Sequence, residues 1–259
     1  MELQRWETPE ERRGQILGYI LAHNRSSVAD LSQHVATSEV TVRKDLDALE
    51  AQGLVLRVHG GAVASGRGRL EQTFGSREQE QIDEKRRIAA AATQLIRAGQ
   101  TVFLDASTTC LQIARLIKGR SGLTVVTNGL YTALELSFSE QIRTLVVGGM
   151  VRAQSSSLVG SLSLDLIERL QLDIGFFGAR GISARAGLTE TDTEEAQLKM
   201  RMVRASLLVV GVADSSKFGR VSLTSFALPG EIDRLFTTDA APAPILAELR
   251  ERGVEVTLV

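Results

Sequence analysis

Residues 38–46 read Ser-Glu-Val-Thr-Val-Arg-Lys-Asp-Leu, and this stretch decides the fold of the first quarter of the chain. Val42 and Leu46, with Leu49 beyond them, recur at helical spacing, which predicts a helix with one buried face. Either Ser38 or the threonine before it is the expected N-cap. The polar positions that fall outside the buried face are Glu39, Thr41, Arg43 and Lys44.

The flanking residues predict two further helices and a small hairpin. Upstream, apolar residues spaced three and four apart predict a helix that begins near Pro9. A break at 23–27 separates it from a second helix, expected from Val28 to Val35. Downstream, Gly53 ends the third helix, and residues 54–63 predict a two-stranded wing that turns at a pair of glycines. This order is typical of a winged helix–turn–helix, here residues 1–62.

The third helix has the residues that contact with DNA requires. Hydrogen-bond donors near the start of such a helix face base edges, and cations nearby pair with phosphates. The predicted DNA-contacting residues are Ser38, Thr41, Arg43, Lys44, Arg57 and His59. Phosphates repel carboxylates, so Asp45 is predicted to be a structural partner instead. The alternative is an ordinary solvated face, in which Arg43 and Lys44 pair with Asp45 and Asp47.

After a glycine-rich segment, 63–76, which is predicted to be a linker, the pattern of the chain changes. A long helix is expected at 77–96. Short apolar runs then alternate with helical segments, which predicts a doubly wound, mostly parallel α/β domain over 77–259. The predicted strands are 101–105, 123–128, 144–148, 174–178, 206–210, 234–239 and 254–259.

Polar loops follow several of these predicted strands, where ligands bind in parallel sheets. In residues 105–109, Asp-Ala-Ser-Thr-Thr, backbone N–H groups and hydroxyls at a helix start form a potential phosphate cradle. The other polar loops are 127–129, 148–149 with Arg152 nearby, 178–181, and 213–219, with Lys199 in the helix before it. Their convergence at one edge predicts a single ligand site.

The composition restricts the class of protein further. Thirty Lys and Arg stand against 31 Asp and Glu, and residues 1–70 hold nine of each sign, so no part is strongly basic. The one cysteine, Cys110, excludes an intramolecular disulfide and a four-thiolate metal site. The three histidines lack metal-ligand spacing, so no metal or cofactor is expected. With no signal-peptide pattern and no long apolar stretch, a cytoplasmic protein without membrane contact is predicted.

The string at 38–46, together with Arg-Val-His-Gly-Gly at 57–61, closely resembles the DeoR family of bacterial transcriptional regulators. The resemblance extends over nearly the whole chain. The effector domain of this family resembles the fold of ribose-5-phosphate isomerase and glucosamine-6-phosphate deaminase. In this chain, residues 195–199 followed by 209–217 resemble the isomerases' pattern of a lysine-bearing helix, an apolar strand and an Asp-x-Ser-Lys loop. The family commonly has Asp-Ser-Gly-Thr-Thr in the first loop, whereas this chain has Ser107 at the third position, where a side chain narrows the cradle or adds a hydroxyl contact.

This resemblance implies a phosphorylated sugar as the effector. It implies phosphate contacts from the loop after the first predicted strand and from Lys217, and sugar or phosphate contacts from Asp105, Asn128 and Lys199. The predicted effector residues are Asp105, Ser107, Thr108, Thr109, Asn128, Gly149, Lys199, Asp214 and Lys217. The related isomerases have acidic residues after their Gly-Ala loop, whereas Arg180 and Gly181 follow here, so no catalysis is expected.

The sequence therefore predicts a repressor of a carbohydrate operon that a phosphorylated sugar controls. Because operators of helix–turn–helix proteins are usually paired half-sites, a homodimer or higher oligomer is expected. Two alternatives remain at this point. One is an active sugar-phosphate isomerase with an appended DNA-binding module, and the other is a constitutive DNA-binding protein whose second domain serves assembly.

Overall fold

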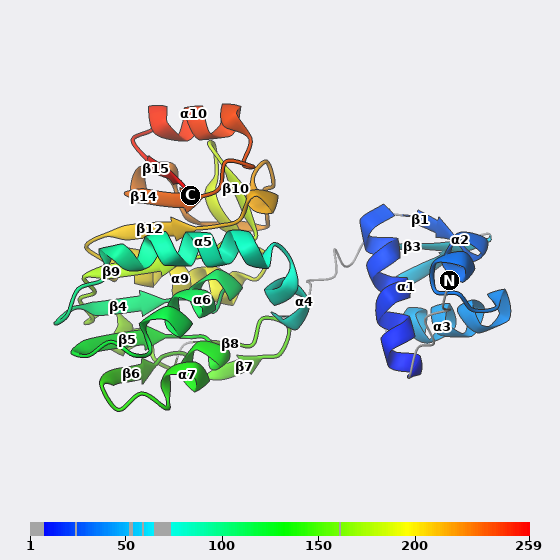
Figure 1. Cartoon of the computed structure of the whole chain (residues 1–259), viewed down its shortest axis with the longest axis horizontal. Helices are drawn as coiled ribbons and strands as arrows, with labels where there is room; N and C mark the ends of the chain where they lie inside the picture. The colour runs from blue at the N-terminus through cyan, green and yellow to red at the C-terminus, as the bar shows by residue number, and fades with distance from the viewer. Residues whose placement is uncertain (1–7, 24, 52–53, 59, 65–73, 161) are drawn as a thin grey trace. The chain divides into compact units, whose positions relative to one another are not determined.

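The computed structural model describes residues 8–23, 25–51, 54–58, 60–64, 74–160 and 162–259. The chain divides into two compact units, Met1–Glu71 and Gln72–Val259 (Figure 1). Strand β3 continues to Ala64 and helix α4 begins at Phe74, so both ends of the predicted linker, 63–76, belong to regular elements. Gly53 and His59 lie outside the described residues.

The N-terminal unit has three helices and a three-stranded antiparallel sheet. The elements are α1 (Pro9–His23), β1 (Arg25–Ser27), α2 (Val28–His34), α3 (Glu39–Ala51), β2 (Val55–Val58) and β3 (Gly61–Ala64), with sheet order β1-β3-β2. The apolar face predicted for α3 is confirmed, since Val42 and Leu46 are fully buried. A core of Ile16, Ile20 and Leu31 packs against them.

The break predicted at 23–27 is wrong in part, because residues 25–27 form β1 and pair with β3. The backbones approach closely there. A Cβ placed on Gly61 would lie 2.2 Å from the Ser26 carbonyl oxygen, so only glycine permits this pairing. Ser27 then begins α2 with a capping box, in which its hydroxyl accepts from the Asp30 N–H.

The C-terminal unit contains a seven-stranded sheet in which every neighbouring pair is parallel, in the order β15-β14-β12-β9-β4-β5-β6. The seven strands are β4 (Thr101–Leu104), β5 (Leu123–Thr127), β6 (Ile142–Val146), β9 (Ile174–Phe177), β12 (Val209–Val212), β14 (Arg234–Thr237) and β15 (Glu255–Leu258). Five of the predicted runs contain their strand, whereas the other two overlap it only in part: the run 144–148 begins two residues after β6 does, and the run 206–210 begins three residues before β12 and ends inside it. Ser206 instead ends the preceding helix.

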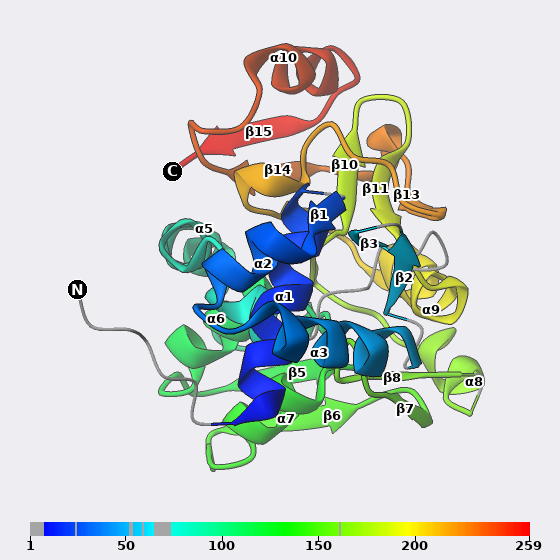
Figure 2. The same cartoon turned by 90° about the vertical axis from the view of Figure 1, so that its right-hand side faces the viewer.

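Helices and smaller strands surround this sheet. The helices are α4 (Phe74–Gln79), α5 (Ile82–Ala92), α6 (Thr108–Ile117), α7 (Leu130–Leu136), α8 (Leu164–Ile167), α9 (Thr193–Ala205) and α10 (Ala243–Glu251), with single 3-10 turns at Thr93–Leu95, Ser215–Lys217 and Pro229–Glu231. Two antiparallel sheets were not predicted. They are the hairpin β7 (Met150–Arg152) and β8 (Ser157–Val159), and the sheet β10 (Gly181–Ser183), β11 (Gly187–Glu190) and β13 (Thr224–Ala227), whose strands lie side by side in Figure 2.

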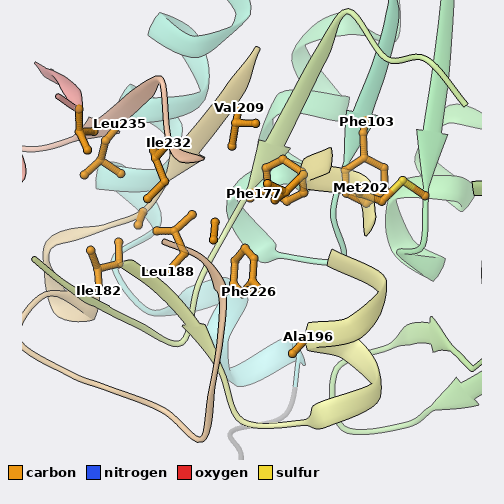
Figure 3. Packing of buried hydrophobic residues seen from close by; sticks show 14 of the residues in the cluster. Phe103, Phe177, Ile182, Leu188, Ala196, Met202, Val209, Phe226, Ile232 and Leu235 are labelled. Carbon is orange, nitrogen blue, oxygen red and sulfur yellow. The ribbon is translucent and has the colours of Figure 1, made fainter. Parts of the chain in front are cut away.

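Both faces of the parallel sheet are buried, as the predicted doubly wound fold requires. In β4, Val102 and Leu104 pack with α5 and α6, whereas Phe103 faces the opposite core with α9 and the sheet of β10, β11 and β13. Figure 1 shows α5 and α6 in front of the parallel strands. Figure 3 shows this second core, in which Phe177 lies between the rings of Phe103 and Phe226, at 5.4 and 6.2 Å between centroids. Successive side chains of the strand therefore point into the two cores on opposite faces of the sheet.

The single long helix predicted at 77–96 is wrong. α4 ends at Gln79, α5 begins at Ile82, and a 3-10 turn follows it. Gln81 between the two helices is left-handed, with φ +50°. The buried Lys85 ammonium donates to the carbonyls of Arg77 and Glu80, which supplies partners at the end of α4.

None of the helices in the described part of the chain is long and apolar enough to cross a lipid bilayer. Over the same residues, no three His, Cys, Asp or Glu side chains are grouped so that they could hold a metal ion.

Candidate functional site

The outward side of α3 is the candidate DNA-binding surface. Its first turn is held by Ser38, whose hydroxyl accepts from the Thr41 N–H at 3.2 Å and lies 2.9 Å from the Thr41 hydroxyl. The cap predicted for this helix is therefore Ser38. Arg43 and Lys44 lie one turn further on and are exposed. The structure thus places four of the predicted DNA-contacting residues along one short stretch of helix.

The arginines near α3 have carboxylate partners, but the pairs differ from those of the solvated-face alternative. Arg43 pairs with Glu39, 2.6 Å between nitrogen and oxygen, and both side chains are half exposed. An exposed pair of this kind contributes less than about 1 kcal/mol, so Arg43 can exchange Glu39 for a nucleic-acid partner at little cost. Arg57 of β2 lies 3.4 Å from Asp47 and donates its N–H to Glu50, which ties the wing to α3.

Asp45 is a structural residue, as predicted. Its carboxylate is 2% exposed and accepts from Arg12 at 2.6 and 3.2 Å and from Arg13 at 3.1 Å. Both arginines belong to α1, so this cluster fixes α3 against α1.

Val40 was not among the predicted DNA-contacting residues. It is 61% exposed at the start of α3, three and four positions before Arg43 and Lys44, and therefore shares their helix face. Apolar side chains on recognition helices contact the thymine methyl group. The sequence signal was present, because Val40 breaks the apolar period that Val42, Leu46 and Leu49 follow.

The candidate effector site lies at the carboxyl ends of β4 and β9. The chain adds β5 and β6 on one side of this pair and β12, β14 and β15 on the other, so the strand order reverses between β4 and β9. Ligands bind in such sheets at this reversal. A small cavity of about 20 Å³, enough for one water molecule, opens there. Its lining residues come from α4, from the start of α6 and from the loops after β9 and β12. They are Arg77, Ser107, Thr108, Thr109, Gly178, Ala179, Arg180, Val212, Ala213, Asp214 and Lys217.

Five predicted effector residues line this cavity and four do not. Those in the lining are Ser107, Thr108, Thr109, Asp214 and Lys217. Asp105 and Lys199 lie beneath it, buried, and Asn128 is also buried. The exposed Gly149 precedes β7, where a Cβ would meet Leu162, and it is not part of the lining. Arg77 was not predicted as an effector residue; it falls in a run of charged residues, 77–87.

An ionic cluster beneath the cavity holds its floor in place. The Lys199 ammonium, 2% exposed, lies 3.0 Å from Asp105 and 2.8 Å from Glu190, and it donates to the Gly178 carbonyl at 3.1 Å. The Asp105 carboxylate also accepts from the Gly178 N–H at 2.9 Å. Since Asp105 follows β4 and Gly178 follows β9, these bonds join the two strand ends at the reversal.

The pKa values of the cluster favour fixed charges. Burial opposes the charge on Lys199, but Asp105, Glu190 and Glu195 together raise its pKa above the usual value. Burial would raise the pKa of Glu190, yet the nearby Lys199 and Arg180 lower it to about 2. A carboxylate of such low basicity is a poor general base. Lys199 and Glu190 therefore remain charged at neutral pH, whereas burial and Glu190 raise the pKa of Glu195 in the same cluster.

The polar side-chain atoms of Asn128 and Ser107 form hydrogen bonds with backbone groups of the protein. The Asn128 side chain accepts from the Ala106 N–H at 3.1 Å and donates to the Leu158 carbonyl at 3.3 Å. The Ser107 hydroxyl accepts from the Cys110 N–H at 3.1 Å and so caps α6. The Ser107 side chain also narrows the space at the loop after β9, because a Cβ on Gly178 would lie 2.4 Å from the Ser107 Cβ.

Comparison with known proteins agrees with both units. Residues 12–67 match the family profile described as DeoR-like helix-turn-helix domain, and residues 80–239 match the profile described as DeoR C terminal sensor domain. The chain belongs to the DeoR family. It is a DNA-binding transcriptional regulator, as predicted, and the isomerase alternative finds no support in the named relatives.

Its relatives are similar over almost their full length. The chain is 35% identical to the HTH-type transcriptional regulator GolR of Listeria innocua, covering 96% of this chain and 98% of that one. It is 37% identical to the HTH-type transcriptional regulator GlpR of Haloferax volcanii (96% and 97%). It is 31% identical to the Glycerol-3-phosphate regulon repressor of Escherichia coli (96% and 98%).

Similar solved structures include ribose 5-phosphate isomerase A from Methanocaldococcus jannaschii. That structure aligns with a TM-score of 0.40 at 15% identity, covering 53% of this chain and 54% of the isomerase.

Proposed function

We propose that this chain represses a carbohydrate operon and that a phosphorylated sugar, bound in the cavity at the ends of β4 and β9, releases it from the operator. The observation that carries this proposal is the donor set of the cavity. Hydroxyls of Thr108 and Thr109 at the start of α6, with Arg180 and Lys217 opposite, suit a phosphate group. Two relatives named as repressors, of the glycerol-3-phosphate regulon and of the aga operon, agree with the sign of regulation.

Effector control requires the ligand to favour one arrangement of the protein over another. A ligand that binds both arrangements equally shifts nothing, however tight it is. The cavity and the DNA-binding surface belong to different units, so the proposed control acts through the segment that joins them. We further propose a homodimer or higher oligomer, because paired half-sites need two copies of α3.

A ligand-dependent operator-binding assay tests the proposal. The DNA is the region upstream of the chain's own gene and its neighbours. The probes are glycerol 3-phosphate and a panel of pentose and hexose phosphates, each beside its unphosphorylated counterpart. We expect one phosphorylated compound to release the DNA and its unphosphorylated counterpart to have no effect. Release by none of the phosphorylated compounds contradicts the proposed effector class.

Two variants assign the roles of the two sites. Arg43→Ala is expected to lower operator affinity to the level of unrelated DNA, whereas Lys217→Ala is expected to retain operator affinity and lose release. Arg86→Ala is the matched control, because it removes one exposed cation of α5 that does not line the cavity. Operator affinity that is unchanged in Arg43→Ala at fixed salt rejects the DNA-contact assignment. If the compound releases Lys217→Ala from the operator at the same concentration as wild type, Lys217 does not bind the phosphate group.

The named relatives also include an L-fucose operon activator of Haemophilus influenzae, 33% identical over 88% of this chain and 91% of that one. The sign of regulation therefore needs its own measurement. Transcription from the operator with and without the chain gives it. Repression that the effector relieves is the expected result, and a rise in transcription when the chain is added overturns it.

A further inference from the structure

Helix α4 brings an arginine into the effector cavity. Arg77 lies on this helix, is 7% exposed, and lines the cavity together with Thr108 and Lys217. In sequence, α4 follows the junction of the two units, which falls between Glu71 and Gln72. One side chain thus belongs both to the cavity wall and to the first described helix after the DNA-binding unit.

The outer contacts of α4 hold it against α6 and α7. Phe74, at its first position, stacks on Tyr131 with 4.6 Å between ring centroids. Glu78 pairs with Arg115 of α6 at 2.8 Å. The Arg77 guanidinium itself lies over the Phe74 ring, 5.4 Å from its centroid. The position of the Arg77 side chain and the position of α4 are therefore linked.

A line of charges joins the end of α4 to the loop after β12. The Lys85 ammonium, 1% exposed, donates to the carbonyls of Arg77 and Glu80 and lies 3.9 Å from Asp214. The same oxygen of Asp214 lies 3.8 Å from the Lys217 ammonium. The loop that carries Lys217 and the helix that carries Arg77 are thus fixed to each other through one buried cation.

The cavity lining has three cationic side chains, Arg77, Arg180 and Lys217, and one carboxylate, Asp214. Burial and the neighbouring Arg180 lower the pKa of Arg77 to about 10, so its guanidinium remains charged at neutral pH. Crowded, desolvated cations are stabilised by an anion placed between them. A guanidinium offers a planar fork of donors that matches two oxygens of one phosphate.

We propose that Arg77 binds the phosphate group of the effector, so that α4, and the junction that precedes it, responds to whether the cavity is occupied. This inference rests on the proposed function, because it adds a residue and a route of regulation to the same cavity. It assigns to Arg77 two measurable properties, a contribution to ligand affinity and a contribution to the protection of α4.

The full-length chain and four variants test it, the fourth being the Lys217→Ala variant described above. Binding of the phosphorylated compound that releases wild-type protein from DNA is measured by calorimetry, and backbone protection of residues 74–79 by hydrogen exchange with and without that compound. Arg77→Gln removes the charge, Arg77→Lys keeps it without the fork, and Arg86→Gln removes an exposed cation of α5 as the control. Thermal unfolding without ligand shows whether each variant folds.

We expect Arg77→Gln to bind the compound at least about tenfold more weakly, Arg77→Lys to recover part of that loss, and Arg86→Gln to match wild type. In wild type the compound should slow hydrogen exchange in residues 74–79, and in Arg77→Gln it should not.

Unchanged affinity in Arg77→Gln, alongside weakened binding in Lys217→Ala, overturns the inference and leaves the proposed function standing. If the bound compound does not change hydrogen exchange in α4 of the wild-type protein, the proposed response of α4 to the occupied cavity is wrong. If no phosphorylated compound binds wild type, the proposed function and this inference both fail.

Discussion

At the scale of single residues, Asp45 is expected to stabilise the N-terminal unit, whereas its neighbours on α3 are the proposed DNA contacts. Asp45→Ala leaves two arginines of α1 without the carboxylate that joins them to α3. Because those arginines are partly exposed, we expect a loss of about 2 kcal/mol in the unfolding free energy of the N-terminal unit, less than for a fully buried pair. Chemical denaturation of the full-length protein measures it. Asp47→Ala is the control, since that side chain is 66% exposed, and an equal effect of the two changes would reject this account.

Glu190 gives the effector unit a defined acid sensitivity. Its pKa is lowered to about 2 by Lys199 and Arg180 against the opposing effect of burial. A lowered pKa in the folded state adds stability above the unfolded value and loses it as the pH falls towards the folded one. We expect a loss of up to about 3 kcal/mol between about pH 4.5 and pH 2. Denaturation midpoints across this range measure it.

Glu190→Gln is the matched comparison for this acid response. The variant is expected to be less stable at pH 7, because Lys199 and Arg180 lose a partner, and to depend less on pH below 4.5. Glu195 acts in the opposite direction, because burial and Glu190 raise its pKa. Equal pH profiles for wild type and Glu190→Gln would show that the acid sensitivity has another source.

Sequence reasoning located the polar residues at strand ends but not the direction in which they face. Asp105 and Asn128 follow β4 and β5 as predicted, yet their polar atoms bond to neighbouring backbone. Residue type and spacing do not distinguish a side chain that supports a loop from one that meets a ligand. Arg77 was missed for a related reason. A charged run looks solvated unless the packing of α4 on the cavity is known.

At the scale of elements, the break between α4 and α5 depends on one strained residue. Gln81 has φ +50°, a conformation that costs most residues about 1 kcal/mol or more and glycine little. Gln81→Gly is therefore expected to preserve or slightly raise the unfolding free energy of the effector unit. Gln81→Val is expected to lower it by about 1 kcal/mol or more, because β-branched residues fit this conformation poorly. Thermal denaturation compares the two variants, and equal transitions would contradict the assignment.

The central strands of the parallel sheet gave the clearest signal in the sequence, because both of their faces are buried. A central parallel strand is covered on both faces, so it reads as a continuous apolar run such as 101–104. The antiparallel strands β10, β11 and β13 each contain a single large apolar residue, Ile182, Leu188 and Phe226 respectively. Such segments have no periodic signal of their own. The pairing of β1 likewise depends on a distant glycine, Gly61, that no local pattern reveals.

At the scale of the whole molecule, the balance of charge limits how the chain binds DNA. Residues 1–70 hold nine basic and nine acidic side chains, so affinity depends on a few placed cations. We expect a shallow dependence of operator affinity on salt, and a slope reduced by about one per half-site in Lys44→Ala. Binding measured at several salt concentrations gives both slopes. A steep wild-type slope that Lys44→Ala leaves unchanged would indicate phosphate contacts elsewhere.

The close approach of Ser107 and Gly178 restricts the order in which this binding site can evolve. Both the Cβ and the hydroxyl of Ser107 lie within 2.6 Å of where a Gly178 Cβ would be, whereas the next neighbour, the Asp105 carboxylate, is 3.7 Å away. A mutation to alanine at 178 is therefore blocked while serine stands at 107 and permitted once glycine replaces it. Glycine at 107 still serves as a helix cap at a cost of a few tenths of a kcal/mol. A lineage that replaces Gly178 by a residue with a side chain must therefore replace Ser107 first.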